Sequence, residues 1–195
     1  MRSILRVMID EKPAFFIVGC WESGTNIVQD IVNRHPAICR ADNGPRADAP
    51  VKVVHVIRDG RDAAVAAWQR LQRLDMERQA TFADHVEHFA LEHWVGFIEQ
   101  ARAAASRDAY LELRYEALHT NPYNEIRRLL DFLGLEATAG TIRTCFDAAL
   151  FQGTIGEWRR HFDDDAAFRF DAVAGYLLQK LGYAEPSRSG IRRAA

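Results

Sequence analysis

The sequence has few cysteines, no long apolar run and no large excess of charge of either sign. Its three cysteines, Cys20, Cys39 and Cys145, are odd in number and widely spaced. That usage is typical of a reducing compartment rather than of a disulfide framework, so we expect a cytoplasmic protein. No stretch approaches the roughly 20 apolar residues that a membrane-spanning helix needs. Met1–Ile9 is too short and too mixed in composition to be a signal peptide.

The charges are nearly balanced, with 25 Lys and Arg against 27 Asp and Glu. Nucleic-acid-binding proteins usually carry a basic surplus, so we expect no nucleic-acid partner. The chain has 195 residues and shows no internal repeat or low-complexity segment. This length suits one domain with a sizeable core. We predict a single domain over residues 1–185 and a mobile, arginine-containing tail over residues 186–195.

The first apolar stretch predicts a strand that turns directly into a helix. Four consecutive apolar residues, Phe15–Val18, predict a buried strand, and apolar residues then recur at helical spacing until Pro36. Such a turn aims backbone N–H groups and the positive end of the helix dipole at one point, which suits a phosphate or sulfate. Ser23 and Thr25 add hydroxyl groups, and Gly24 lets the backbone approach an anion.

The same turn has the Gly19-x-x-x-x-Gly24 spacing of a Walker A loop. However, Thr25-Asn26 stands where that motif has lysine followed by serine or threonine, so an ordinary ATP site is disfavoured. The alternative is a β-turn-α connection that binds nothing, because turns rich in Gly, Ser and Thr are common.

Two more strands and several helices are predicted further along the chain. The β-branched run Val51–Ile57 predicts a second buried strand, which leads into the turn Arg58–Asp62. A strand, a helix and a strand at this spacing imply a parallel pair, and the alternation as a whole implies an α/β domain. The remaining predictions are helices over about 63–74, 81–105, 122–134 and 171–181, a strand over 110–113, a short helical stripe over 142–149, and loops over 37–50 and 153–160.

Four motifs, in the right order, resemble the sulfotransferases that use 3′-phosphoadenosine-5′-phosphosulfate (PAPS). They correspond to the loop that holds the 5′-phosphosulfate, the strand and turn that hold the 3′-phosphate, the signature "Tyr-Glu-x-Leu … Pro … Phe-Leu-Gly", and a C-terminal cofactor loop. In this sequence they are Phe15–Asn26, Val53–Arg61, Leu111–Leu135 with Tyr115-Glu116-Ala117-Leu118, Pro122 and Phe132-Leu133-Gly134, and Gly153-x-x-Gly156-x-Trp158.

The resemblance implies a three-layer α/β fold, with a parallel sheet flanked by helices, that is related to P-loop NTPases and shortened here. It implies PAPS, or its product 3′-phosphoadenosine-5′-phosphate (PAP), as cosubstrate, with no metal and with a small-molecule or glycan acceptor. Arg58 would pair with the 3′-phosphate, since a guanidinium fits a phosphate bidentately. Tyr115 would approach the adenine, and Gly153 would let backbone N–H groups reach the 3′-phosphate. The residues implied at the 5′ end are Ser23, Gly24, Thr25 and Asn26, and Trp21 is a further cofactor-binding candidate.

The sequence departs from the family pattern where the chemistry takes place. Glu22 stands where members have Lys or Arg, a cation that offsets charge as the sulfuryl group leaves. The candidate catalytic residues are therefore Glu22, as a possible base, with Thr25 and Asn26. The other departures are Trp21 for proline, Ile27 for an aromatic residue, Ala66 for serine, and Phe151-Gln152 for an Arg-Lys pair.

The segment between Pro36 and the second strand is also much shorter than in family members, which build much of the acceptor pocket there. Apolar surface near the anion loop would then be exposed, or covered in a homodimer. The candidates to replace the missing cations are Arg159, Arg160 or an arginine of the tail.

Three functions remain open from the sequence. The first is a sulfotransferase that moves a sulfuryl group from PAPS to a hydroxyl or amine. The second is a catalytically impaired, sulfotransferase-like module that binds a nucleotide or a protein. The third is a P-loop kinase, which the lack of lysine after Gly24 and of an obvious Mg²⁺-binding Asp at a strand end disfavours.

The other titratable side chains are predicted to be structural. His55 lies on a buried strand and is predicted to be a core histidine. His85 and His88 share a helix face, and a solvated face is favoured over a metal site because a third ligand, Glu92 or His93, would sit well round the helix. The remaining acids are Asp59 and Asp62, predicted to cap the helix after them, and Asp163–Asp165, predicted to form a solvated turn.

Overall fold

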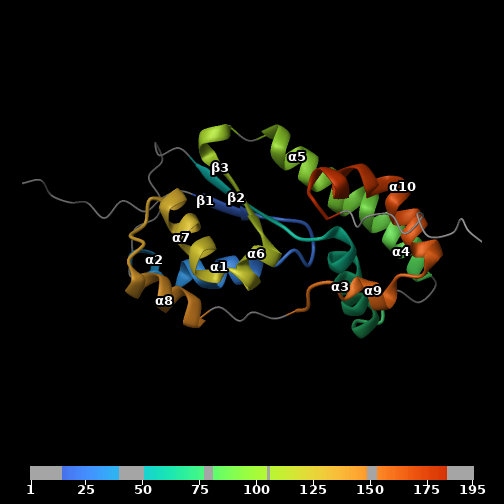
Figure 1. The fold of residues 1–195 in the computed structure, drawn as a ribbon, viewed down its shortest axis with the longest axis horizontal. Helices are drawn as coiled ribbons and strands as arrows, with labels where there is room; N and C mark the ends of the chain where they lie inside the picture. Colours follow the sequence, from blue (N-terminus) through green and yellow to red (C-terminus); the bar gives the residue numbers. More distant parts are fainter. Residues whose placement is uncertain (1–14, 40–50, 77–80, 105, 149–152, 184–195) are drawn as a thin grey trace, which may run out of the picture. The chain divides into compact units, whose positions relative to one another are not determined.

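The structure is a computed structural model that describes residues 15–39, 51–76, 81–104, 106–148 and 153–183. Its contacts divide the chain into two compact units, each built from two separate stretches (Figure 1). Unit 1 comprises Met1–Arg58 and Ala101–Gly153, and unit 2 comprises Asp59–Gln100 and Thr154–Ala195. The single domain over residues 1–185 stays a prediction, and the predicted tail over residues 186–195 lies outside the described residues.

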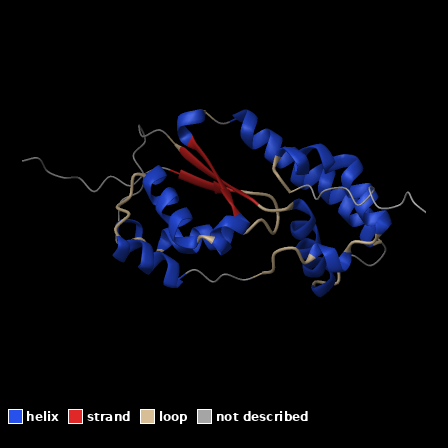
Figure 2. Ribbon diagram, in the orientation of Figure 1, coloured by secondary structure: helices blue, strands red, loops and turns tan. Residues whose placement is uncertain are grey.

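Unit 1 contains a parallel sheet of three strands in the order β1-β2-β3, drawn in red in Figure 2. The register pairs Val18 with His55 and Ile57 with Arg114. This sheet and its helices confirm the predicted α/β fold with parallel strands. The strands are β1 (Phe15–Val18), β2 (Lys52–Ile57) and β3 (Tyr110–Arg114).

The prediction that β1 is a buried strand was wrong. In the sheet as described, β1 is an edge strand that pairs with β2, and the side chain of Phe16 is 63% exposed. An edge strand has a neighbour on one side only, so an apolar run there is covered less than the same run in a central strand.

Helices cover one face of the sheet in unit 1 (Figure 1). Val54 and Val56 of β2 point to this face together with Leu111 and Leu113 of β3, and all four belong to one buried apolar cluster with the helices. Gly134 ends one of these helices in the left-handed conformation, as predicted. The helices of the cluster are α1 (Thr25–Asn33), α6 (Tyr115–Thr120), α7 (Pro122–Leu133) and α8 (Ala139–Ala148), and the short α2 (Pro36–Cys39) lies within the segment predicted as a loop.

Unit 2 is helical in its described part, and its core is aromatic. Trp94, Phe89 and Phe170 are almost completely buried. A π-helix, η1, interrupts the long predicted helical segment, and α10 packs against both α4 and η1. The elements are α3 (Gly60–Arg73), α4 (Phe82–His88), η1 (Phe89–Val95), α9 (Trp158–His161) and α10 (Asp164–Lys180), together with α5 (Gly96–Ala104), whose last turn and the following 3₁₀ turn η2 (Arg107–Ala109) belong to unit 1.

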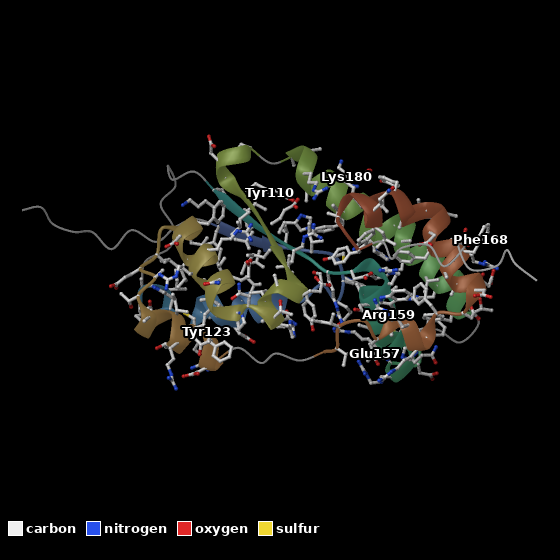
Figure 3. All side chains as sticks on the ribbon, in the orientation of Figure 1. Tyr110, Tyr123, Glu157, Arg159, Phe168 and Lys180 are labelled. Carbon is white, nitrogen blue, oxygen red and sulfur yellow. The ribbon has the colours of Figure 1, made fainter. Side chains whose placement is uncertain are left out.

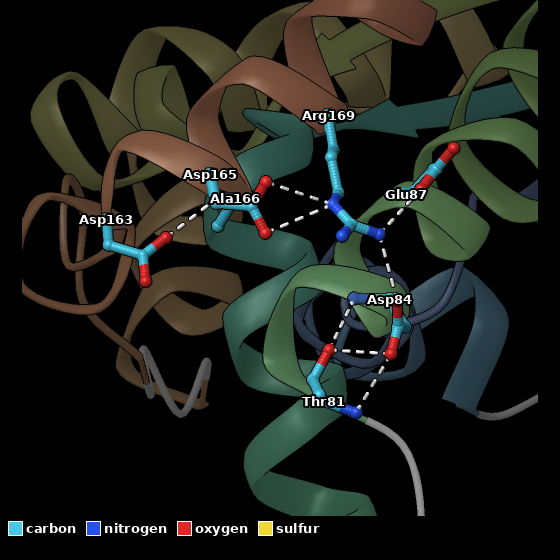
Figure 4. A network of polar contacts seen from close by, with 7 residues as sticks. All are labelled: Thr81, Asp84, Glu87, Asp163, Asp165, Ala166 and Arg169. Carbon is cyan, nitrogen blue, oxygen red and sulfur yellow. Dashed lines mark hydrogen bonds and ion pairs between the residues drawn. The ribbon is translucent and has the colours of Figure 1, made fainter.

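A polar network on the surface of unit 2 joins α10 to α4 (Figure 4). The guanidinium of Arg169 contacts Asp84 at 2.9 Å and Glu87 at 3.3 Å, and it also pairs with Asp165 on its own helix. Thr81 and Asp84 form a capping box at the start of α4. Exposed pairs of this kind contribute little individually, so the network mainly supports the apolar contacts between the two helices.

Two predicted boundaries in unit 2 were wrong. The last helix begins at Asp164 rather than near residue 171, because the carboxylate of Asp163 caps it by accepting from the backbone N–H of Ala166 at 2.8 Å. Asp163–Asp165 is therefore a helix start rather than a solvated turn. The predicted loop over residues 153–160 likewise contains the start of α9.

Candidate nucleotide-binding site

The candidate site residues of unit 1 follow the carboxyl ends of its three strands. Ser23 and Gly24 come after β1, Arg58 after β2 and Tyr115 after β3. Parallel strands bring these ends to the same edge of the sheet, which is where open α/β sheets bind ligands. Gly153 joins them from much later in the chain.

The turn after β1 combines a buried hydroxyl group with a helix start that lacks a side-chain cap. The side chain of Ser23 is completely buried, and its Oγ has no hydrogen-bond partner among the described residues. Gly24 adopts the left-handed conformation, with φ of 94°, at the start of α1. Among the residues that the structure describes, no side chain caps this helix, and its first turn has no acidic residue. The helix start is therefore electrostatically suited to an anion.

Tyr115 lies at the centre of the site and is only 2% exposed. Its ring lies directly against two glycines that follow other elements. A Cβ added to Gly24 would lie 2.9 Å from Cε2 of Tyr115, and a Cβ added to Gly153 would lie 2.5 Å from its hydroxyl oxygen. Larger residues at either position would therefore displace the ring. The approach of Tyr115 to an adenine stays a prediction.

Arg58 lies against the ring of Tyr115, with Cζ 4.3 Å from the ring centroid. It is 5% exposed, and its Nη1 donates to the backbone oxygen of Glu22 at 2.8 Å. Glu22 has a positive φ of 60°, which is uncommon for a residue with a Cβ. Glu22 therefore contacts Arg58 through its backbone carbonyl oxygen.

His119 is a residue that the sequence analysis missed. Its ring stacks on Tyr115 at a centroid distance of 4.2 Å, and its Nδ1 lies 2.9 Å from the backbone oxygen of Tyr115. The spacing of Tyr115 and His119 could have predicted this contact, because residues at i and i+4 are neighbours on a helix face. His119 thereby supports one side of the Tyr115 ring.

The structure brings together Ser23, Gly24, Arg58, Tyr115 and Gly153. The other predicted binding residues lie on the same loop and helix start but face water to a greater degree. The side chain of Trp21 is 58% exposed, Asn26 is exposed, and Thr25 is half-buried. The role of each as a ligand-binding residue stays a prediction.

Burial makes the thiol of Cys20 chemically inert, although it lies within this loop. Removal from water raises its pKa to about 12. The thiolate is the nucleophilic form of cysteine, so Cys20 is not a nucleophile at neutral pH.

The opposite face of the sheet contains a polar network around His55. The Nδ1 of His55 lies 2.5 Å from the hydroxyl of Tyr110, which donates to Glu112 at 3.0 Å, so His55 is the donor in the first bond. Arg102 binds Glu112 with two hydrogen bonds, of 2.6 and 2.8 Å. Figure 3 labels Tyr110 at the start of β3. His55 is completely buried, which confirms the prediction of a core histidine.

This network predicts a loss of stability in acid. Burial lowers the pKa of His55 from 6.5 to about 4, because the imidazolium is disfavoured away from water. Between these two values the unfolded chain holds more protons than the folded one, so the free energy of unfolding falls as the pH falls. We expect a loss of about 3 kcal/mol from pH 6.5 to 4 in urea unfolding. His55→Gln should lack this component, and equal pH slopes for both proteins would contradict the assignment.

One histidine of unit 2, His85, contradicts the prediction of a solvated helix face, whereas His88 is exposed as predicted. His85 is buried, not solvated, with Nε2 3.1 Å from the backbone oxygen of Ala64 and its ring 5.1 Å from that of Trp68. The π-helix brings the ring of His93 to 5.7 Å from that of His88, because its hydrogen bonds close five residues on. Among the described residues, however, no three potential ligands are arranged to hold a metal ion.

The two acidic residues at the start of α3, Asp59 and Asp62, have different hydrogen-bond partners. Asp59 caps the helix as predicted, accepting from the backbone N–H of Arg61 at 3.0 Å. The prediction of the same role for Asp62 was wrong, because its carboxylate binds backbone N–H groups of Gly156 and Trp158 instead.

The profile of the sulfotransferase domain matches residues 45–154, which is more than half of the chain. The chain belongs to the sulfotransferase domain family. The match includes Arg58, Tyr115 and Gly153, whereas the loop Ser23–Asn26 of this sulfotransferase-domain chain lies before it. Within the described residues, none of the helices has both the length and the apolar character needed to cross a bilayer.

Two relatives come from Arabidopsis thaliana. Cytosolic sulfotransferase 3 is 27% identical over 106 residues, which cover 45% of this chain and 31% of the relative. Cytosolic sulfotransferase 11 is 25% identical over 178 residues, which cover 67% of this chain and 48% of the relative. The chain thus spans less than half the length of these two sulfotransferases.

Solved structures of sulfotransferases share the fold. The mouse sulfotransferase SULT7A1 complexed with PAP has a TM-score of 0.68 at 14% identity, with 87% of this chain and 85% of that chain covered. Retinol dehydratase in a complex with retinol and PAP has a TM-score of 0.68 at 16% identity, with 90% and 84% covered. At identities this low, the structural similarity shows that the fold is shared and nothing more.

Proposed function

We propose that this chain is a sulfotransferase that moves the sulfuryl group of PAPS to a hydroxyl or amine of a small molecule or glycan. The observation that carries the proposal is the convergence of Ser23, Gly24, Arg58 and Gly153 around the ring of Tyr115 at the carboxyl ends of the strands. Family membership supports the same reaction.

The residues present fit a nucleotide with two phosphorylated ends. The buried hydroxyl of Ser23 has no partner in the described structure, and the start of α1 has uncapped N–H groups, so both suit the 5′-phosphosulfate. Arg58 provides a guanidinium for the 3′-phosphate. Three of the similar solved structures are complexes with PAP. When bound, PAPS supplies an activated sulfuryl group for in-line transfer.

Catalysis is assigned to residues of the same loop. Thr25 and Asn26, at the start of α1, bind the oxygens of the 5′ end. The carboxylate of Glu22 accepts the proton of the attacking group, since a general base must lie next to the acceptor. Trp21, which is largely exposed, contributes an apolar surface at the entrance of the site. Structures of retinol dehydratase contain retinol or androsterone with PAP, which supports a small-molecule acceptor.

Calorimetric titration of the full chain with PAP, and with ATP as control, tests this function. We expect micromolar binding of PAP and at least about tenfold weaker binding of ATP, because Arg58 selects for a 3′-phosphate. A protein that binds PAP should then be given PAPS with a panel of phenols, alcohols and amines. Equal binding of PAP and ATP, or no binding of either, would refute the proposed donor.

A further inference from the structure

An exposed ridge of side chains runs along α10 in unit 2. Phe168 is 74% exposed, Tyr176 is 51% exposed, and Ala172, midway between them, is exposed as well. Each of the three follows the one before it by four positions, so they are neighbours on one side of the helix. The core side of α10 carries Phe170 and Ala174, which lie roughly 160° around the helix from Ala172. Two large aromatic side chains therefore point away from the core of unit 2.

Opposite charges stand at the two ends of this ridge. Asp164 lies four positions before Phe168, Lys180 lies four positions after Tyr176, and both are exposed. Figure 3 labels Phe168 near the start of α10 and Lys180 at its end. We call Asp164, Phe168, Ala172, Tyr176 and Lys180 the α10 ridge. Its order is acid, aromatic ring, small residue, aromatic ring and base, so the reversed ridge offers a matching partner to each of its own members.

We propose that the α10 ridge binds a second copy of this chain, with the two α10 helices antiparallel about a two-fold axis at Ala172. In a two-fold interface both copies use the same surface, so each residue meets the one that lies equally far on the other side of the axis. Phe168 then contacts Tyr176 of the second copy, and Asp164 faces Lys180 of the second copy. This surface belongs to unit 2, whereas the apolar surface expected beside the anion loop belongs to unit 1.

The shape of the ridge suits the packing of one helix on another. Residues four positions apart form the ridges of the commonest packing class, in which helices cross at about 50° with axes about 8–10 Å apart. Ala172 at the crossing point and Gly175 beside it are small, so the two backbones can approach closely. The ring of Tyr176 is already held in place, because its hydroxyl donates to Glu99 at 2.5 Å. A side chain fixed before binding loses less conformational freedom in the dimer.

The charges favour a second copy in one orientation. Antiparallel helices pair Asp164 with Lys180 twice in each dimer, whereas parallel helices would place like charges side by side. Asp165 and Arg169 do not disturb this pattern, because they pair with each other and Arg169 also contacts Asp84 of α4. One helix from each copy gives a small interface, so we expect a weak dimer that dissociates on dilution.

Sedimentation velocity of the full chain from about 1 to 500 µM tests the proposal, and we expect a dimer with a dissociation constant of about 10–100 µM. Phe168→Glu should raise that constant at least about tenfold, because it would bury two carboxylates per dimer against aromatic rings. Met76→Glu is the matched control. Met76 is 68% exposed in unit 2 but lies outside α10, so its replacement should leave the constant unchanged. Urea unfolding checks that each variant is folded.

Charge exchange tests the antiparallel orientation. Asp164→Lys and Lys180→Asp should each raise the dissociation constant at least about fivefold at low salt, because each variant alone brings two pairs of like charges together. An equimolar mixture of the two variants should associate as tightly as the wild type, since every facing pair is then of opposite sign.

A wild-type chain that stays monomeric at the highest concentration would overturn the proposal and assign the ridge to a different partner. The proposal also fails if Phe168→Glu leaves the dimer intact. Charge variants that dimerise as tightly as the wild type, or whose mixture does not associate, would contradict the antiparallel pairing of the α10 ridge.

Discussion

Gly24→Ala is expected to lower the free energy of unfolding by about 3 kcal/mol and to weaken PAP binding more than tenfold. Two costs combine at this position. The left-handed conformation that Gly24 adopts costs an alanine roughly 1–2 kcal/mol. Its methyl group would also clash with the buried ring of Tyr115. Urea unfolding and PAP titration measure the two effects.

Gly134→Ala separates the backbone cost from the clash. Gly134 is also left-handed, with φ of 77°, and it also flanks a helix of unit 1, at the end of α7. A Cβ added there would meet only Lys52 Nζ, at 3.9 Å. We expect a loss of about 1 kcal/mol and unchanged PAP affinity. In a Tyr115→Ala background, the loss of unfolding free energy caused by Gly24→Ala should also fall to about 1 kcal/mol. The reason is that the added methyl group then no longer meets the ring of Tyr115. Equal losses for Gly24→Ala and Gly134→Ala would contradict the close approach to Tyr115.

Arg58→Ala is expected to weaken PAP binding by about 1.5–3 kcal/mol, which is roughly 10- to 100-fold. The guanidinium is nearly buried and held by the carbonyl of Glu22 and the ring of Tyr115, so it is already in place before an anion arrives. Arg58→Lys should recover only part of the affinity, because an ammonium cannot form the bidentate contact of a guanidinium. Calorimetry with PAP gives the dissociation constants.

Arg143→Ala is the control for the loss of one positive charge. Arg143 belongs to unit 1, is largely exposed and pairs with Asp147 on its own helix at 3.5 Å. Its removal should change PAP affinity less than twofold at physiological salt, because exposed charges are screened over about 8 Å. If Arg58→Ala and Arg143→Ala weaken binding equally, Arg58 acts only through net charge and its assignment to the 3′-phosphate is wrong.

The sequence was a good guide wherever the information was local. Alternating strands and helices predicted the parallel sheet, and Phe15–Val18 forms the first strand at the predicted bounds. Gly134 after an apolar helical stripe marked a helix end. Asp163 carried a local signal that the prediction overlooked, because an acidic run before an apolar periodic segment is typical of a helix start.

The features that could not be predicted from the sequence depend on contacts between residues far apart in the chain. The exposure of Phe16 depends on the order of the strands, which is a property of the sheet and not of the segment. The role of Asp62 depends on backbone groups more than 90 positions away. His85 looked like a surface residue by its spacing, yet Trp68 and Ala64 cover it from another helix. Local pattern sets the elements, and packing decides what their polar side chains contact.

The residues of the candidate site are far apart in the sequence, so the ribosome makes them at different times. Ser23 is made first, then Arg58, then Tyr115, and Gly153 last. β2 also pairs with β3, which follows it only after a long crossover, so the sheet depends on contacts of high sequence separation. A nascent chain that still holds Gly153 in the ribosome has the loop Ser23–Asn26 but cannot yet place Gly153 against the ring of Tyr115. If the proposed function holds, the nucleotide site is therefore complete only late in synthesis, and earlier intermediates must stay soluble without a ligand that stabilises them.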